Sequence, residues 1–462
     1  MTDSNKNMHE PAASPMTPRV EEAEKPSYIY DLDDLPPFRF SLIYGLQWAV
    51  IVFPAFVITA ALVAGPLGLG TAGEIRFLQL TLFTSGLFTV IQTLLGHRFP
   101  LVEGPSTALV LTFILLAHYG LPALQGGLIL GGTLLVLMVL SGQLDRAIRL
   151  FTPNVVGVIL MLIALGLLPA LVRFMTGVDA AHPRGEVQVF VISLGLVLLI
   201  ATLSYRLRGF CKTVSLLIGM ALGCFVFLML HRLPWQKMLD APWLSLSTPW
   251  FQTAPGLNWP TAVAFGCAYL AVMVNSLGSL QGVAGITDQG RLPAATRRGI
   301  LINGAAGISC GLLGVVGTVS YSTGPGLILV NRVASRFTVT YCGIILLAAA
   351  FIPKLAALLA LVPAPVVGAA LCIAMGAQVG AGITIVASRK LGSRDYFVVG
   401  LPVLVGTLVG FLPPELIGSL PGYLQVFLAN SLVTGIIMVL ALEHLLLRDG
   451  RKGIKVTKVS SD

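Results

Sequence analysis

The sequence predicts an all-α, polytopic membrane protein with fourteen transmembrane segments arranged as a seven-plus-seven inverted repeat. The composition, the placement of basic residues and similar motifs seven segments apart support this prediction. Of the 462 residues, 56% are hydrophobic and 11% are charged, whereas soluble domains carry about 25% charged residues. A bilayer solvates that much apolar surface and a soluble core cannot hold it, so we expect an integral membrane protein.

Apolar runs between breaks in the chain give fourteen segments, and twelve is the main alternative count. They lie near 40–64, 77–96, 101–119, 122–142, 153–174, 187–204, 212–231, 259–281, 298–317, 320–334, 338–359, 363–387, 396–412 and 421–446. Most approach the roughly 20 residues that a helix needs to cross a bilayer. The third and tenth segments are short and contain glycine and proline.

Basic residues concentrate in every second connection between segments. If both termini are cytoplasmic, the inside connections and the C-terminal tail hold 19 Lys and Arg, against 6 outside. Since positive charge favours the cytoplasmic side, we expect a multi-pass protein of the plasma (bacterial inner) membrane with both termini inside. Residues 1–37 lack a signal-peptide layout and are expected to form a disordered cytoplasmic arm, and residues 447–462 a basic tail.

The net charge of +9 and the six cysteines do not indicate nucleic-acid or metal binding. The basic residues lie in short connections rather than on one face. The cysteines occur singly, without a CxxC pair, which predicts neither a metal site nor a disulfide framework. We find no nucleophile–base pair and expect no enzyme activity and no cofactor beyond a coupling ion. Lone histidines near segment ends are interpreted as interfacial: His97, His118, His231 and His444.

Two pairs of motifs recur seven segments apart. Residues 102–110 (VEGPSTALV) resemble 322–329 (STGPGLIL), and 151–157 (FTPNVVG) resemble 362–368 (VPAPVVG). An odd number of segments per repeat places the second copy upside down. Chance recurrence of Gly-Pro in a glycine-rich chain is the alternative for either pair alone, and the shared offset favours an inverted repeat.

The Gly104-Pro105 and Gly324-Pro325 pairs predict interrupted helices at matched positions. Irregular backbone at membrane depth requires protein or water to satisfy its polar groups. We therefore expect the two broken segments to meet near the bilayer midplane, where free amides and half-helix N-termini bind polar substrate atoms. Two helix kinks without a ligand are the alternative.

Glu103 is the acidic residue expected inside the membrane, within the broken third segment. Placing a charge at the bilayer centre costs about 2.5–3.5 kcal/mol on insertion scales. Such a residue is kept mainly when it is paired, protonated or functional. We interpret Glu103 as a substrate ligand and as the site of proton coupling. An interfacial carboxylate facing loop water is the alternative.

In the eighth segment, Asn275 and Ser279 are four residues apart and share a helix face. An amide offers both a donor and an acceptor, as the edge of a heterocycle requires. Interhelical hydrogen bonding is the alternative role. The remaining predicted substrate-binding residues lie in segments one, three and ten: Gln47, Gly104, Ser106, Thr107, Tyr321, Ser322, Thr323, Gly324 and Asn331.

Three stretches carry a resemblance to a known family. Residues 150–157, 362–371 and 320–336 together resemble the nucleobase–ascorbate transporter family, which includes uracil and xanthine permeases. The similarity extends over about residues 38–446. It implies a substrate-carrying core domain (38–142 and 259–360) and a gate domain (143–232 and 361–446), with short strands in segments three and ten and a homodimer formed through the gate.

The chain departs from this family's usual motifs in the eighth and tenth segments. Asn275 stands where the family usually has a glutamate, with Ser279 at the partner position. Thr323-Gly324 replaces the usual Glu or Gln followed by Asn, and Asn331 replaces a threonine, while Gly326 is retained. Together with Glu103, these changes suggest that a carboxylate has moved to segment three.

The resemblance implies a secondary transporter that works by alternating access on a purine, xanthine or uracil type of nucleobase. Protons are the expected coupling ion, with sodium as the alternative. A second hypothesis is an anion carrier of the same fold that resembles sulfate permeases, although those usually append a soluble domain and this chain ends soon after its last segment. A carrier of another planar solute, a channel and a membrane-embedded enzyme are further alternatives.

Overall fold

The computed structural model describes residues 27–178, 182–233, 236–239, 241–244, 253–421, 428 and 430–447. The predictions for residues 1–26 and 448–462 lie outside these. The described chain is mainly helical with two short strands: α1 (Phe38–Ala64), α2 (Thr71–Leu94), β1 (Glu103–Pro105), α3 (Thr107–Leu115), η1 (Ala117–Tyr119), α4 (Leu121–Leu140), α5 (Leu144–Leu150), α6 (Pro153–Gly166), α7 (Leu168–Thr176), α8 (Val187–Arg206), α9 (Gly209–Thr213), α10 (Ser215–Met229), α11 (Gln236–Leu239), α12 (Trp259–Ile286), η2 (Gln289–Arg291), α13 (Leu292–Leu313), β2 (Thr318–Ser320), α14 (Gly324–Asn331), α15 (Arg336–Ala350), α16 (Pro353–Ala360), α17 (Ala364–Val386), α18 (Ser393–Val409), α19 (Pro414–Ser419), α21 (Ser431–Ala441) and η3 (Leu442–Leu446).

Each predicted segment overlaps a helix or a strand–helix unit of this series. Among the described residues, seven helices are by themselves long and apolar enough to cross a bilayer, or eight if α15 and α16, bent by 92° at their break, count as one span. The chain is therefore an integral, multi-pass membrane protein, while the count of fourteen stays a prediction. One boundary prediction was wrong: the ninth segment was expected to start near residue 298, whereas α13 starts at Leu292, because that helix begins before its apolar part.

The packing repeats itself when the two halves of the chain are exchanged. Helix α4 packs against α12 and α13, and α15 packs in the same way against α1 and α2. Glycines make both crossings close: a Cβ added to Gly132 would lie 2.6 Å from the Gly304 oxygen, and one added to Gly86 would lie 2.7 Å from the Gly343 oxygen. Small residues at helix crossings let backbones approach in membranes. This exchange symmetry agrees with the predicted inverted repeat.

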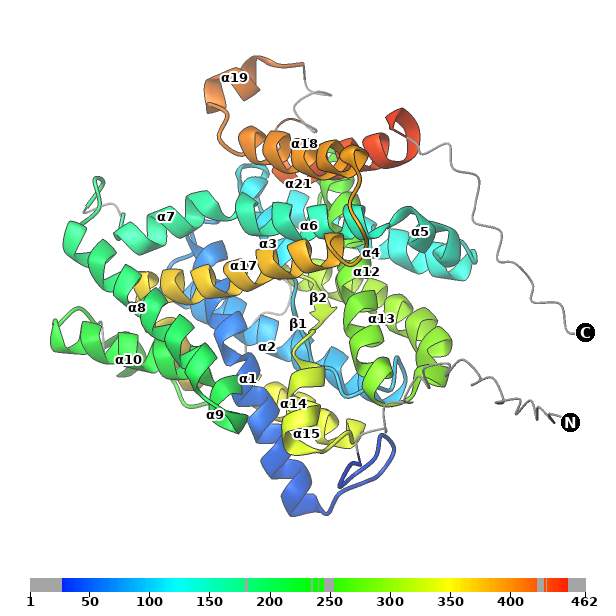
Figure 1. Ribbon diagram of the computed structural model, residues 1–462. Coiled ribbons are helices and arrows are strands. Elements are labelled where there is room, and N and C mark those ends of the chain that lie inside the picture. Colours follow the sequence, from blue (N-terminus) through cyan, green and yellow to red (C-terminus); the bar gives the residue numbers. More distant parts are fainter. Residues whose placement is uncertain are drawn as a thin grey trace, which may run out of the picture.

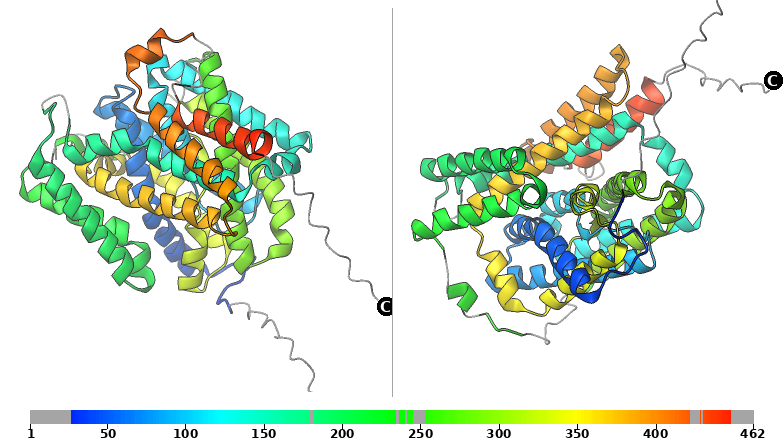
Figure 2. Two further views of the ribbon diagram at one scale, coloured as in Figure 1. Left: turned by 45° about the horizontal axis from the view of Figure 1, so that its top comes forward. Right: turned by 60° about the horizontal axis from the view of Figure 1, so that its bottom comes forward.

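The helices form two groups that lie beside each other (Figure 2, right). In the first helix group, α1–α4 pack with α12–α15 around the strands; in the second, α6 packs with α17, α18 and α21, and α8 with α10 and α17. Smaller contacts join the groups, including those of α1 with α17 and of α3 with α6. The roles of the first group as a substrate-carrying core and of the second as a gate remain predictions.

Strands β1 and β2 pair antiparallel at the centre of the molecule, with α3 and α14 leading away from them (Figure 1). Glu103 pairs with Ser320 and Pro105 with Thr318. Both broken segments are thus strand–helix units, as predicted. The two Gly-Pro motifs do not occupy equivalent places, however. Gly104-Pro105 lies in β1, whereas Gly324-Pro325 begins α14 after β2 has ended. Proline suits the first helical turn, where its missing N–H would have no partner.

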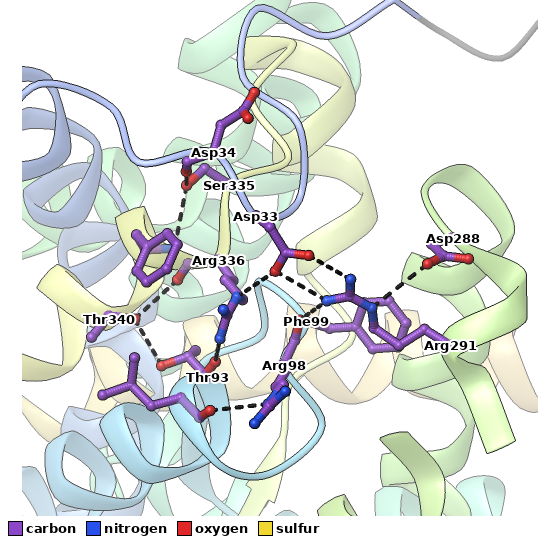
Figure 3. A network of polar contacts seen from close by, with 12 residues as sticks. Asp33, Asp34, Thr93, Arg98, Phe99, Asp288, Arg291, Ser335, Arg336 and Thr340 are labelled. Atoms are coloured by element: carbon purple, nitrogen blue, oxygen red, sulfur yellow. Dashed lines mark hydrogen bonds and ion pairs between the residues drawn. The ribbon is translucent and has the colours of Figure 1, made fainter. Parts of the chain in front are cut away.

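Residues 27–36, part of the arm predicted to be disordered, cross the first helix group as an ordered strap. Ile29 donates its N–H to the Arg332 oxygen, and Ala334 donates to the Tyr30 oxygen. Asp33 forms ion pairs with Arg291 and Arg336 at 2.5 and 2.7 Å (Figure 3). The hydrogen bond from Arg291 lowers the pKa of Asp33 below its ordinary value. Backbone pairing and these charges order a segment whose composition alone indicated disorder.

Candidate substrate-binding site

In each strand–helix unit the helix follows its strand closely. The N-termini of α3 and α14 therefore lie near the paired strands β1 and β2. Ser106 and Thr323 occupy the N-cap positions, and neither side chain caps its helix. The first amides of such helices have no partner within the helix and carry partial positive charge. The Ser106 N–H donates to the Gly317 oxygen at 3.0 Å, which ties the start of α3 to the chain entering β2.

Glu103 is fully buried beside the strand pairing. Its N–H donates to the Thr89 hydroxyl at 2.9 Å. The Ser320 hydroxyl donates to carboxylate Oε1. The other oxygen, Oε2, has no hydrogen-bond partner in the described part of the chain. A buried oxygen without a donor costs free energy unless it is protonated or a ligand meets it, so Glu103 retains capacity for a proton or for a substrate N–H.

His97 lies beside this carboxylate, which corrects its interpretation as an interfacial residue. Its Nε2 is 3.7 Å from Glu103 Oε1, and both side chains are fully buried. The Phe99 N–H donates to His97 Nδ1 at 3.0 Å. The connection after α2 folds back under the strands, so a residue at a segment end in sequence becomes internal.

Tyr321 covers the other part of β1. Its ring lies so near Gly104 that an added Cβ would be 2.3 Å from the ring carbon Cζ. Its hydroxyl donates to the Pro105 oxygen at 3.2 Å, and its N–H donates to the Val102 oxygen at 3.0 Å. Glycine at 104 is therefore required for the aromatic ring to approach the strand.

The two predicted residues of α12, Asn275 and Ser279, differ in their contacts. Ser279 is buried and donates to the Ser320 oxygen at 2.8 Å, or to the Asn275 oxygen at 3.0 Å. Asn275 is half-buried, and its side-chain amide makes no hydrogen bond within the described chain. Ser279 thus joins α12 to β2, and the Asn275 amide stays free for a ligand.

The remaining predicted residues divide between the strands and the far end of α14. Ser106 and Gly324 are buried, Thr107 is half-buried, and Ser322 and Thr323 are exposed in the turn before α14. Gln47 and Asn331 exchange two amide hydrogen bonds of 3.1 and 3.0 Å. This reciprocal pair satisfies both amides and joins α1 to the end of α14, which favours a structural role for these two residues.

Two cavities in the described residues lie away from Glu103. One of about 230 Å³ lies under the strap, between Tyr28 and Asp288. A smaller one of about 40 Å³ lies near Arg76 and Gln125. The carboxylate of Glu103 is enclosed in this conformation, so a ligand reaches it only after neighbouring groups move. The described residues hold no cluster of three or more metal-ligating side chains.

A polar network behind the strands was not predicted. Gln92 donates to the Asn303 oxygen at 2.5 Å and to the Gly299 oxygen at 2.9 Å. Asn303 donates to the Ser276 hydroxyl at 2.6 Å. The His97 N–H donates to Gln92 Oε1 at 3.3 Å, which links the network to the Glu103 site. The signal was present in sequence, as amide side chains within apolar segments, but the partners of Gln92 in α13 lie 207 and 211 positions away.

Paired half-helices that meet around a buried carboxylate, inside a symmetric multi-pass bundle, define a membrane transporter fold. The family model described as a permease family, for xanthine and uracil permeases, matches residues 39–415. The chain therefore belongs to this permease family, within the nucleobase–ascorbate transporters. Membership confirms the predicted resemblance and identifies a transporter rather than an enzyme.

Relatives named as permeases or transporters cover most of the chain at low identity. The uric acid permease PucK of Bacillus subtilis is 26% identical over 70% of this chain and 76% of its own. The nucleobase transporter PlUacP of Paenibacillus larvae is also 26% identical, over 70% of this chain and 75% of its own. Among solved structures, the transmembrane domain of the cyanobacterial bicarbonate transporter BicA matches 80% of this chain and 95% of its own, with a TM-score of 0.55 and 13% identity. That last likeness shows the shared fold alone.

Proposed function

We propose that this permease is a secondary active transporter that carries a nucleobase of the purine or related oxo-heterocycle class, coupled to protons. The observation that carries this proposal is the buried Glu103 carboxylate, which keeps one oxygen unpartnered beside the two half-helices. Relatives named for uric acid and nucleobase transport support the substrate class.

In this proposal, ring N–H groups of the substrate donate to Glu103, and the Asn275 amide binds the heterocycle edge. Backbone N–H groups at the start of α3 and α14 donate hydrogen bonds to its carbonyl oxygens. Glu103 takes up a proton in one orientation of the site and releases it in the other. The protein lies in the bacterial inner membrane with both termini cytoplasmic and forms a homodimer through the second helix group.

The test uses purified protein in proteoliposomes with an imposed pH gradient. Wild-type protein is expected to accumulate labelled uric acid, xanthine or uracil. Glu103→Gln is expected to abolish accumulation, because an amide neither carries a proton nor accepts a ring N–H at both atoms. Glu415→Gln, the same change at an exposed residue of α19, is the matched control and should retain accumulation.

Unchanged uptake and pH dependence in Glu103→Gln would remove its assigned role. The anion-carrier alternative rests on the fold alone. Competition by excess bicarbonate or sulfate but by none of the nucleobases would favour that alternative, and inhibition by the bases alone would support the proposal.

A further inference from the structure

The His97 ring is the part of the buried site that the proposed transport cycle leaves without a role. It is 1% exposed, and its Nε2 has no hydrogen-bond partner among the described residues. Nε2 points to a carboxylate oxygen 3.7 Å away, longer than a hydrogen bond but within ion-pair distance. A buried donor and a buried acceptor, each incompletely satisfied, face each other across this gap.

The protonation state of the ring follows from its other nitrogen. Nδ1 accepts the Phe99 N–H at 3.0 Å, so it cannot carry a proton of its own in this arrangement. A neutral imidazole with an unprotonated Nδ1 has its proton on Nε2. The His97 ring therefore presents a fixed Nε2–H donor toward Glu103.

The surroundings hold the ring in this position. The His97 N–H donates to Gln92 Oε1, and Gln92 is itself tied to Asn303. On the cytoplasmic side, Arg336 donates to the Thr93 oxygen at 2.8 Å, and Arg291 to the Arg98 oxygen at 3.5 Å (Figure 3). The connection that carries His97 is thus fixed from both sides.

Few other ionisable groups compete for the carboxylate. Cys310 of α13 and Tyr321 after β2 are within electrostatic reach of Glu103, and both are neutral donors at most. The charged groups above the connection, Arg291 and Arg336, are engaged by Asp33 of the strap. Within the described chain, His97 is the one basic side chain in contact with Glu103.

We propose that His97 is a positioning residue that donates its Nε2–H to the deprotonated Glu103 and thereby sets the pH at which the carboxylate loads its proton. This inference rests on the proposed function of Glu103. When the proton leaves, the 3.7 Å gap closes and the charge gains a donor besides Ser320. His97 itself stays neutral throughout the cycle.

The experiment follows the carboxyl group directly, in ligand-free protein, by its protonated-acid carbonyl band in infrared difference spectra across a pH series. A band absent in Glu103→Gln assigns Glu103. His97→Leu removes the donor and should move the midpoint of the band to higher pH by about one to two units. His97→Gln, which keeps an N–H donor that cannot become a cation, should titrate within a few tenths of a unit of the wild type. The pH dependence of coupled uptake should also shift more in His97→Leu than in His97→Gln.

The outcomes separate the two proposals. An unchanged midpoint in His97→Leu overturns the inference and leaves the role of Glu103 standing, whereas no band assignable to Glu103 removes the proton-coupling role itself. If Gln shifts the titration as strongly as Leu, His97 carries a proton and the donor role is wrong. Nitrogen-15 NMR of histidine-labelled wild type, with His97 assigned by difference from His97→Gln, provides a test without an apolar variant. A neutral Nε2–H ring across the titration supports the inference, and an imidazolium contradicts it.

Discussion

At the scale of single residues, the site depends on contacts that tolerate almost no added volume. Gly104 lies beneath the Tyr321 ring, and Glu103 next to it is enclosed on all sides in this conformation. Ser320 serves twice, through its hydroxyl to Glu103 and through its carbonyl oxygen to Ser279. The geometry around the carboxylate is therefore set by neighbours that are themselves fixed.

Gly104→Ala should place a methyl group 2.3 Å from Tyr321 Cζ and displace the ring or the strand. We expect a loss of about 1–3 kcal/mol in stability, typical of overpacking, together with a transport rate reduced at least tenfold. Thermal unfolding of detergent-solubilised protein and uptake in proteoliposomes measure the two effects. The double variant Gly104→Ala/Tyr321→Ala should recover stability, and wild-type uptake by Gly104→Ala alone would show that the contact is not needed.

At the scale of elements, paired glycines allow helices of opposite halves to cross closely. Gly86 and Gly343 join α2 to α15, and Gly132 and Gly304 join α4 to α13. Both crossings flank the strand pair, so the distance between these helices sets the position of β1 against β2. Van der Waals packing, rather than a hydrophobic driving force, holds such crossings in lipid.

Gly343→Ala should separate α2 and α15, because the new Cβ would lie 2.8 Å from Val90 Cγ2 and 2.9 Å from the Gly86 oxygen. We expect a lower midpoint of thermal unfolding, equivalent to about 1–3 kcal/mol. Gly266→Ala in α12 is the control, since no atom lies within 4 Å of its added Cβ. The control should be neutral or stabilising by up to about 1 kcal/mol. Equal midpoints for the two variants would argue against the close crossing.

At the scale of the whole molecule, transport by alternating access requires the two helix groups to move against each other. Their contacts are few compared with those inside each group, as between α3 and α6. The strap joins the connections around Arg291 and Arg336 within the first group. The first group is thus held together at the end where the strap crosses it.

A disulfide across the boundary between the groups should stop this motion. A Cβ at Gly166 of α6 would lie 2.8 Å from Leu111 Cδ2 of α3. In a background with the six native cysteines replaced, we expect oxidation of a Leu111→Cys/Gly166→Cys protein to abolish uptake and a reducing agent to restore it. Each single variant controls for the substitution. Full uptake by the cross-linked protein would exclude relative motion at this contact.

The sequence by itself determined the membrane class, the positions of the segments and the two interrupted units, one of which carries Glu103, because hydropathy, charge alternation and Gly-Pro breaks are local properties of a chain. Only the tertiary structure decided which residues meet Glu103. Ser320 is separated from it by 217 positions, and His97 reaches it only because its connection folds inward. The same holds for the Gln47–Asn331 pair and the ordered strap. Contacts between residues far apart in sequence depend on the register of packed elements, and a linear pattern does not specify that register.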